Sequence, residues 1–158
     1  MFIAALCLMV STGLMFFFLQ AVCQRVLRRR FNQEFYPAIV TANRLEFPWV
    51  RKAIEDYGTP RDYLRLTTTL KCDFVGLTYL LKHAVNVDQR MTYKEHLLTL
   101  YFRVLFVSLV TRRWLRLRED SAVLKLTTIL QYFANVVGER VHTVRYGSPT
   151  PSDYLSNL

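Results

Sequence analysis

The longest hydrophobic run of the chain lies at its N-terminus. Residues 1–23 carry no charge, and Ser11, Thr12 and Gln20 are the polar interruptions. A helix of about 21 residues, rising about 1.5 Å per residue, crosses a hydrocarbon core about 30 Å thick. A helix is also the conformation that satisfies its own backbone in lipid. The pattern therefore predicts an uncleaved transmembrane anchor over residues 1–23.

A cleaved signal peptide is the main alternative for this segment. Met1 alone precedes the apolar run, so the positively charged start of a signal peptide is missing. The run is also longer than the usual apolar region of a signal peptide, and no small-x-small cleavage site precedes the charged flank. Cys23 follows the bulky Val22, which argues against a lipoprotein signal, although its thiol could accept an acyl chain. These features favour the anchor.

Four arginines follow the apolar run directly, with no acidic residue among them: Arg25, Arg28, Arg29 and Arg30. The positive-inside bias places this side in the cytoplasm and Met1 outside. Arginines at this position also meet anionic head groups, each contributing about 1 kcal/mol. We expect a single-pass membrane protein, in the inner membrane if it is bacterial. Residues 24–47 would form a basic juxtamembrane connector.

Beyond the connector, apolar positions recur at helical spacing. A proline or a capping residue begins each helix, and the predicted helices cover roughly 48–57, 59–85, 92–116 and 121–140. Thr92 and Glu95 form a capping-box pattern at the start of the third. No segment shows a convincing period of two. The sequence therefore predicts an all-α fold, in which the anchor precedes a bundle of about four helices over 48–146. An irregular tail covers 147–158.

Segment 97–110 is apolar on nearly every side and is interrupted by Arg103. About 14 residues is short for a second membrane span, and an arginine at its middle would be costly in lipid. We therefore expect the central helix of the bundle, covered by its neighbours. A membrane-embedded helix is the alternative.

Asp73 lies at the edge of the apolar stripe of helix 59–85, and Arg103 is the one cation within segment 97–110. A buried charge is costly unless it is paired. We therefore predict a structural ion pair between Asp73 and Arg103 that joins the two helices.

Motifs of known chemistry are absent from the sequence. There is no phosphate-binding glycine loop, nucleophile elbow or Cys-x-x-Cys pair, and the three histidines lack the spacing of a metal pair. Cys72 has no partner in the bundle, which fits a reducing compartment. We expect no cofactor and no metal. A small membrane-bound enzyme that uses His83, His96 and Asp73 remains an alternative.

The chain is basic, with 21 Lys and Arg against 12 Asp and Glu, and a second arginine cluster follows segment 97–110. Arginines beside a tryptophan suit a membrane interface, and the same chemistry suits nucleic acid. An anchored chain favours lipid or an acidic protein surface over nucleic acid. The residues predicted to bind lipid or a partner are Arg25, Arg28, Arg29, Arg30, Arg112, Arg113, Trp114 and Arg116.

The function expected from these features is that of a non-enzymatic accessory or scaffold subunit in a larger membrane complex. Its partners would be other membrane protein subunits and anionic lipid head groups. The alternative binding role is a membrane-tethered module that recognises anionic lipid or an acidic partner through the arginine clusters.

Overall fold

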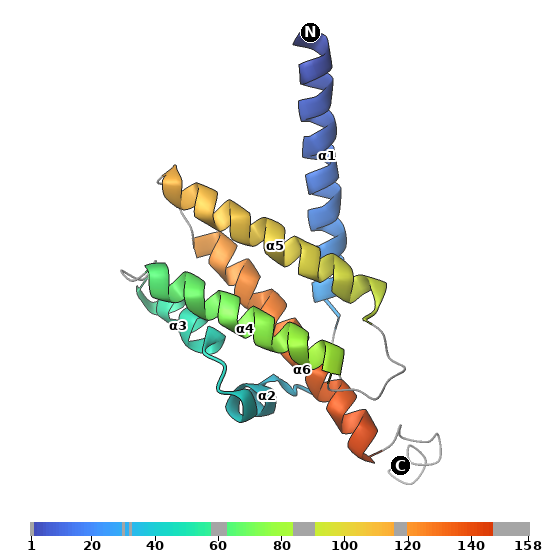
Figure 1. Cartoon of the computed structure of the whole chain (residues 1–158), viewed down its shortest axis with the longest axis vertical. Coiled ribbons are helices and arrows are strands. Elements are labelled where there is room, and N and C mark those ends of the chain that lie inside the picture. Colours follow the sequence, from blue (N-terminus) through green and yellow to red (C-terminus); the bar gives the residue numbers. More distant parts are fainter. Residues whose placement is uncertain are drawn as a thin grey trace.

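The computed structural model describes residues 2–29, 31, 33–57, 63–83, 91–115 and 120–146. The described chain is all-helical, as the sequence predicts. Its helices are α1 (Phe2–Leu27), α2 (Tyr36–Asn43), α3 (Phe47–Tyr57), α4 (Tyr63–His83), α5 (Tyr93–Trp114) and α6 (Asp120–Tyr146). Figure 1 shows α1 extending away from a packed bundle that the other helices form. Several of the predicted features lie outside the described residues. They are the helix start at Thr59 and Pro60, the two arginines Arg30 and Arg116, and the tail 147–158.

The N-terminal helix α1 is one continuous helix of 26 residues. It runs on to Leu27, past the end predicted at Cys23. Within the described chain, Ile3–Leu27 is the one helix long and apolar enough to cross a membrane, with a mean hydropathy of 2.1 in its most apolar window. Membrane anchors and signal sequences share this length and composition.

The last turns of α1 belong to the bundle. Cys23 is fully buried, and Leu19, Val26 and Leu27 pack against the hydrophobic core. The Cys23 thiol lies 4.0 Å from the carbonyl oxygen of Leu97 on α5. A buried thiol is not accessible for acylation in this packing, so Cys23 serves as a core residue.

The central helix of the bundle is α6, which contacts each of the other five helices. Its residues from Ala122 to Gly138 are buried or half-buried. The expectation that segment 97–110 is the covered central helix was wrong, because α5 buries one side and exposes the other. Gly138 lets α2 approach α6 closely, because a Cβ at this position would lie 2.1 Å from Phe35 Cβ.

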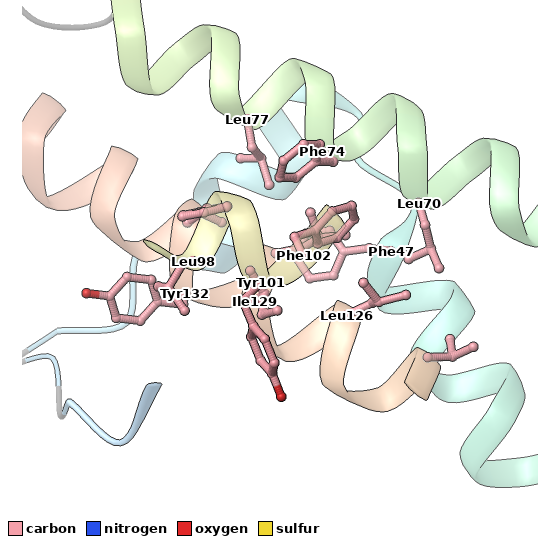
Figure 2. Close-up of a cluster of buried hydrophobic side chains, with 14 of the residues drawn as sticks. Phe47, Leu70, Phe74, Leu77, Leu98, Tyr101, Phe102, Leu126, Ile129 and Tyr132 are labelled. Carbon is pink, nitrogen blue, oxygen red and sulfur yellow. The ribbon is translucent and has the colours of Figure 1, made fainter. Parts of the chain in front are cut away.

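Buried side chains from α1, α3, α4, α5 and α6 form one hydrophobic core. Figure 2 shows Leu77 and Phe74 of α4 pointing toward Phe102 of α5 and the side chains of α6. The rings of Phe74 and Phe102 stack with centroids 3.9 Å apart, and Phe133 lies 6.3 Å from Phe74. Burying each such side chain contributes roughly 1.5–3 kcal/mol. This aromatic stack joins α4 to α5.

Helix α2 lies inside the predicted connector 24–47, where the sequence predicts no helix. A side chain of α6 accepts the hydrogen bonds of the N–H groups at the start of α2. Asn135 Oδ1 accepts from the N–H groups of Phe35 (2.9 Å) and Tyr36 (2.8 Å). The helix ends at Asn43, and the capping residue Arg44 has a left-handed φ of 51° and donates its N–H to the Val40 carbonyl oxygen. A cap supplied by α6 thus positions α2.

Candidate interaction surfaces

Asp73 does not form the predicted ion pair with Arg103. Its Oδ2 atom accepts hydrogen bonds from the N–H groups of Glu46 (2.9 Å) and Phe47 (2.7 Å) at the start of α3. Burial raises the pKa of Asp73, and the two N–H donors oppose that rise. Arg103 is instead exposed on α5. The prediction failed because the free N–H groups of a helix start supplied the partners that a buried carboxyl requires.

A buried ion pair does exist, between Arg140 of α6 and Glu95 of α5. Arg140 Nη2 lies 2.6 Å from Glu95 Oε1, and the two side chains are 11% and 6% exposed. Arg140 Nη1 also donates to the carbonyl oxygen of Leu81 near the end of α4 (3.1 Å). Glu95 Oε2 accepts from the N–H of Thr92 (3.0 Å), which forms the Glu95 half of the predicted capping box. This cluster therefore joins the end of α4, the start of α5 and the side of α6.

The residues of the enzyme hypothesis have separate surroundings. His83 is exposed, stacks on Tyr79 and has its Nδ1 atom 2.9 Å from the Tyr79 carbonyl oxygen. His96 is exposed, with its Nδ1 atom 3.3 Å from the Thr92 carbonyl oxygen. Asp73 is bound at the start of α3. Among the residues that the structure covers, no group of three His, Cys, Asp or Glu side chains could hold a metal ion.

The first arginine cluster lies at the C-terminal end of α1. Arg25 and Arg28 are exposed. Arg29 binds Glu139 of α6, with Nη2 3.1 Å from Oε1, and its guanidinium lies 5.2 Å from the centroid of the Phe31 ring. Arg29 therefore links the segment after α1 to α6 by an exposed ion pair, while Arg25 and Arg28 present their charge to the surroundings.

The second arginine cluster lies at the C-terminal end of α5, whereas α1 contacts α5 near its N-terminal end. Arg112 donates to the Ser121 hydroxyl (3.3 Å), and the Arg113 guanidinium lies 4.8 Å from the centroid of the Tyr63 ring. Trp114 is 85% exposed. At about 1.5 Å per residue, Trp114 lies about 25 Å along α5 from Leu97, which contacts Cys23 of α1. The arginines thus form two separate patches.

A groove that the sequence did not predict runs between α4 and α5. Two adjoining cavities of about 400 and 380 Å³ form it, and both are lined by Phe74, Val75 and Arg103. The other lining residues are Lys71, Thr78, Lys82, Met91, His96, Thr99, Leu100, Phe102, Phe106 and Val107. The sequence feature that could have indicated the groove is the apolar side chains at helical spacing on the two helices. The sequence alone does not distinguish such exposed side chains from core residues.

Comparison with known protein families gives no match, and comparisons with curated proteins and solved structures give none either. The candidate surfaces are therefore the apolar length of α1, the two arginine patches and the α4/α5 groove.

Proposed function

We propose that this chain is a non-enzymatic accessory subunit of a larger membrane protein complex. The observation that carries the proposal is the contrast between α1 and the bundle. The bundle buries a hydrophobic core between its helices, whereas large apolar side chains are exposed along almost the whole apolar length of α1, among them Ile3, Met9 and Phe17. In a bilayer, lipid or the helices of other subunits would cover these side chains.

The proposed topology places Met1 outside and the bundle in the cytoplasm. Exposed Arg25 and Arg28 support it, because they follow the apolar length of α1 on the side that carries the bundle. Anionic head groups would lie within reach of both side chains. Other membrane protein subunits are the proposed partners of α1 and of the exposed side of α5.

The test compares the full-length chain with a variant that lacks residues 2–18. That deletion removes the exposed length of α1 and keeps Leu19 and Cys23, which pack on the bundle. We expect the full chain to resist carbonate extraction, to keep its original N-terminus, and to migrate in a native gel with a larger assembly after mild solubilisation. The deletion variant should become extractable. A mature N-terminus beyond Cys23, or migration as a free monomer, would refute the proposal.

A second candidate function is recognition of anionic lipid through the arginine patches. The exposure of Arg25, Arg28 and Trp114 favours it, since arginine and tryptophan suit the head-group layer. The chain lacking residues 2–18 should then float with phosphatidylglycerol vesicles at low salt. The variant Arg25→Gln/Arg28→Gln should lose this binding, whereas Arg44→Gln, at an exposed site on another helix end, should keep it. Binding that salt does not weaken would exclude this function.

A further inference from the structure

We propose that the groove between α4 and α5 receives an acidic amphipathic α-helix of a partner protein. The inference rests on the proposed role as a subunit, and it specifies the kind of partner segment that the bundle recognises. The form, the exposed apolar residues and the charge of the groove each support this occupant.

The form of the groove follows from the packing of three helices. Helix α6 contacts both α4 and α5, while the backbones of α4 and α5 stay apart. The stacked rings of Phe74 and Phe102 fill the bottom of the space between them. Figure 2 shows these two side chains facing one another from α4 and α5. An open channel between two helices, with an aromatic floor, is the shape that a third helix fills in helix-in-groove recognition.

Large apolar side chains remain uncovered along this channel. Val75 of α4 is 57% exposed, and Leu100 and Val107 of α5 are 52% and 64% exposed. Leu100 and Val107 are separated by two helical turns and line the two adjoining cavities, one each. A partner helix would contact them with apolar residues at positions i, i+3 or i+4, and i+7.

The charge of the groove selects an acidic occupant. Lys71, Lys82 and Arg103 are the charged residues among its lining, and no carboxylate lines either cavity. Within the described chain, none of the three cations forms an ion pair. The nearby acids face elsewhere, because Asp73 binds the start of α3 and Glu95 binds Arg140.

The spacing of the cations favours a helix over a lipid. Lys71 and Lys82 are about 16 Å apart along α4, or about three helical turns, and Arg103 borders both cavities between them. One phosphate group cannot meet charges spread over that length. Acidic residues on the flanks of a helix, one per turn, can meet all three. The occupant is therefore a polypeptide helix with an apolar face and acidic flanks.

The test uses the full-length protein in nanodiscs of neutral phosphatidylcholine. The probes are fluorescent helical peptides of about 18 residues with leucines at i, i+3, i+4 and i+7 and glutamates on both flanks. The panel shifts the leucine register from peptide to peptide. Saturable binding, measured by fluorescence anisotropy, is expected for at least one register. The same peptide with lysines in place of its glutamates should bind at least about tenfold more weakly, because like charges then face each other.

Variants of the protein locate the binding in the groove. Val107→Glu and Arg103→Glu should each weaken binding by about tenfold or more, since each places a carboxylate against the acidic peptide. Leu64→Glu and Lys52→Glu are the matched controls, because both residues are exposed and lie outside the groove. Both controls should bind as the natural chain does, and all four variants should keep its helical circular dichroism.

Several outcomes would overturn the proposal. These are no saturable binding by any register, equal binding of lysine and glutamate peptides, or binding that Val107→Glu and Arg103→Glu leave unchanged. A fluorescent phosphatidylglycerol that binds the natural chain, and is lost in these two variants, would assign the groove to lipid instead. The subunit role has a separate readout. A chain that binds no peptide but migrates in a larger assembly refutes the groove alone, whereas a monomer that binds peptide refutes the subunit role alone.

Discussion

The Arg140–Glu95 pair should be the most sensitive polar contact of the bundle. In the variant Arg140→Met, the Glu95 carboxylate stays buried with the Thr92 N–H as its remaining described donor, and the Leu81 carbonyl oxygen loses its bond to Arg140. Removing one partner of a buried pair costs about 3–5 kcal/mol because the other charge is left uncompensated. For a chain of this size that loss lowers the midpoint of thermal unfolding by about 6–20 °C.

The assay is thermal and urea unfolding of the full chain in a mild detergent, followed by far-ultraviolet circular dichroism. A double-mutant cycle adds Glu95→Leu and the combined variant Glu95→Leu/Arg140→Met. The combined variant should be more stable than Arg140→Met alone, because apolar side chains of similar size replace a buried pair at little cost. Its remaining loss, about 1 kcal/mol, reflects the missing hydrogen bond that the Thr92 N–H donates to Glu95 Oε2.

The exposed pair between Arg51 and Glu55 provides the matched control. Its atoms lie 2.9 Å apart, as close as in many buried pairs, but the side chains are 41% and 52% exposed. Glu55→Gln should therefore change the free energy of unfolding by less than about 1 kcal/mol. The reasoning is refuted if Arg140→Met costs no more than Glu55→Gln, or if the two single losses at Arg140 and Glu95 simply add.

Two further predictions concern backbone packing and pH. Gly138→Ala should destabilise the fold by about 1–3 kcal/mol, because the new Cβ would lie 2.1 Å from Phe35 Cβ. Gly76→Ala should instead stabilise α4 by about 0.5–1 kcal/mol, because a Cβ there has nothing within 4 Å. Urea unfolding of both variants checks that the two changes in stability have opposite signs. Because burial raises the pKa of Asp73, the folded state holds its proton more tightly than the unfolded state. The stability of the natural chain relative to Asp73→Asn should be greatest below the ordinary pKa of 3.8 and fall as the pH rises through the folded pKa. A difference that grows with pH would show that hydrogen bonds to the start of α3 outweigh burial.

The helices with a strong apolar stripe could be predicted from the sequence. The expected 48–57 and 92–116 agree with α3 and α5 to within two residues at each end, because caps and periodicity lie within each segment. The predicted start of α6 at Ser121 is also close. Its C-terminal end was placed too early, since the helix continues to Tyr146. Arg140, at the predicted end, bonds to the carbonyl oxygen of Leu81 on α4, a contact that no local pattern records.

The contacts that sequence reasoning missed are hydrogen bonds and ion pairs between segments that lie far apart along the chain. Helix α2 has no capping side chain of its own, and its acceptor, Asn135, comes about 100 residues later. The capping-box pattern located Glu95 but not its partner Arg140. Asp73 was recognised as a buried acid, yet its partners are backbone groups that any residue at positions 46 and 47 would offer, except for proline. Residue types alone therefore could not identify these pairs.

Periodicity also could not tell which apolar side chains would be covered. Phe102 and Val107 stand in the same apolar segment, yet Phe102 is buried while Val107 is exposed. A helix rich in apolar residues on all sides fits both a central position and a position with one open side. In the fold, α6 takes the central position and packs against both α4 and α5, whose backbones stay apart. The α4/α5 groove follows from this arrangement, which the apolar pattern of α5 alone does not indicate.

The junction between α1 and the bundle sets how the proposed groove would be presented. A flexible linker would let the bundle turn freely beneath a membrane, but the proposed anchor continues directly into the core through the last turns of α1. Cys23 is buried against α5, and Leu19, Val26 and Leu27 pack on the core, so the last turns of α1 are held by the bundle. The proposed anchor and the wall of the groove are thus joined through α5 itself. A partner helix would accordingly meet the groove at one orientation to the bilayer, which suits recognition of a segment that is itself attached to the membrane.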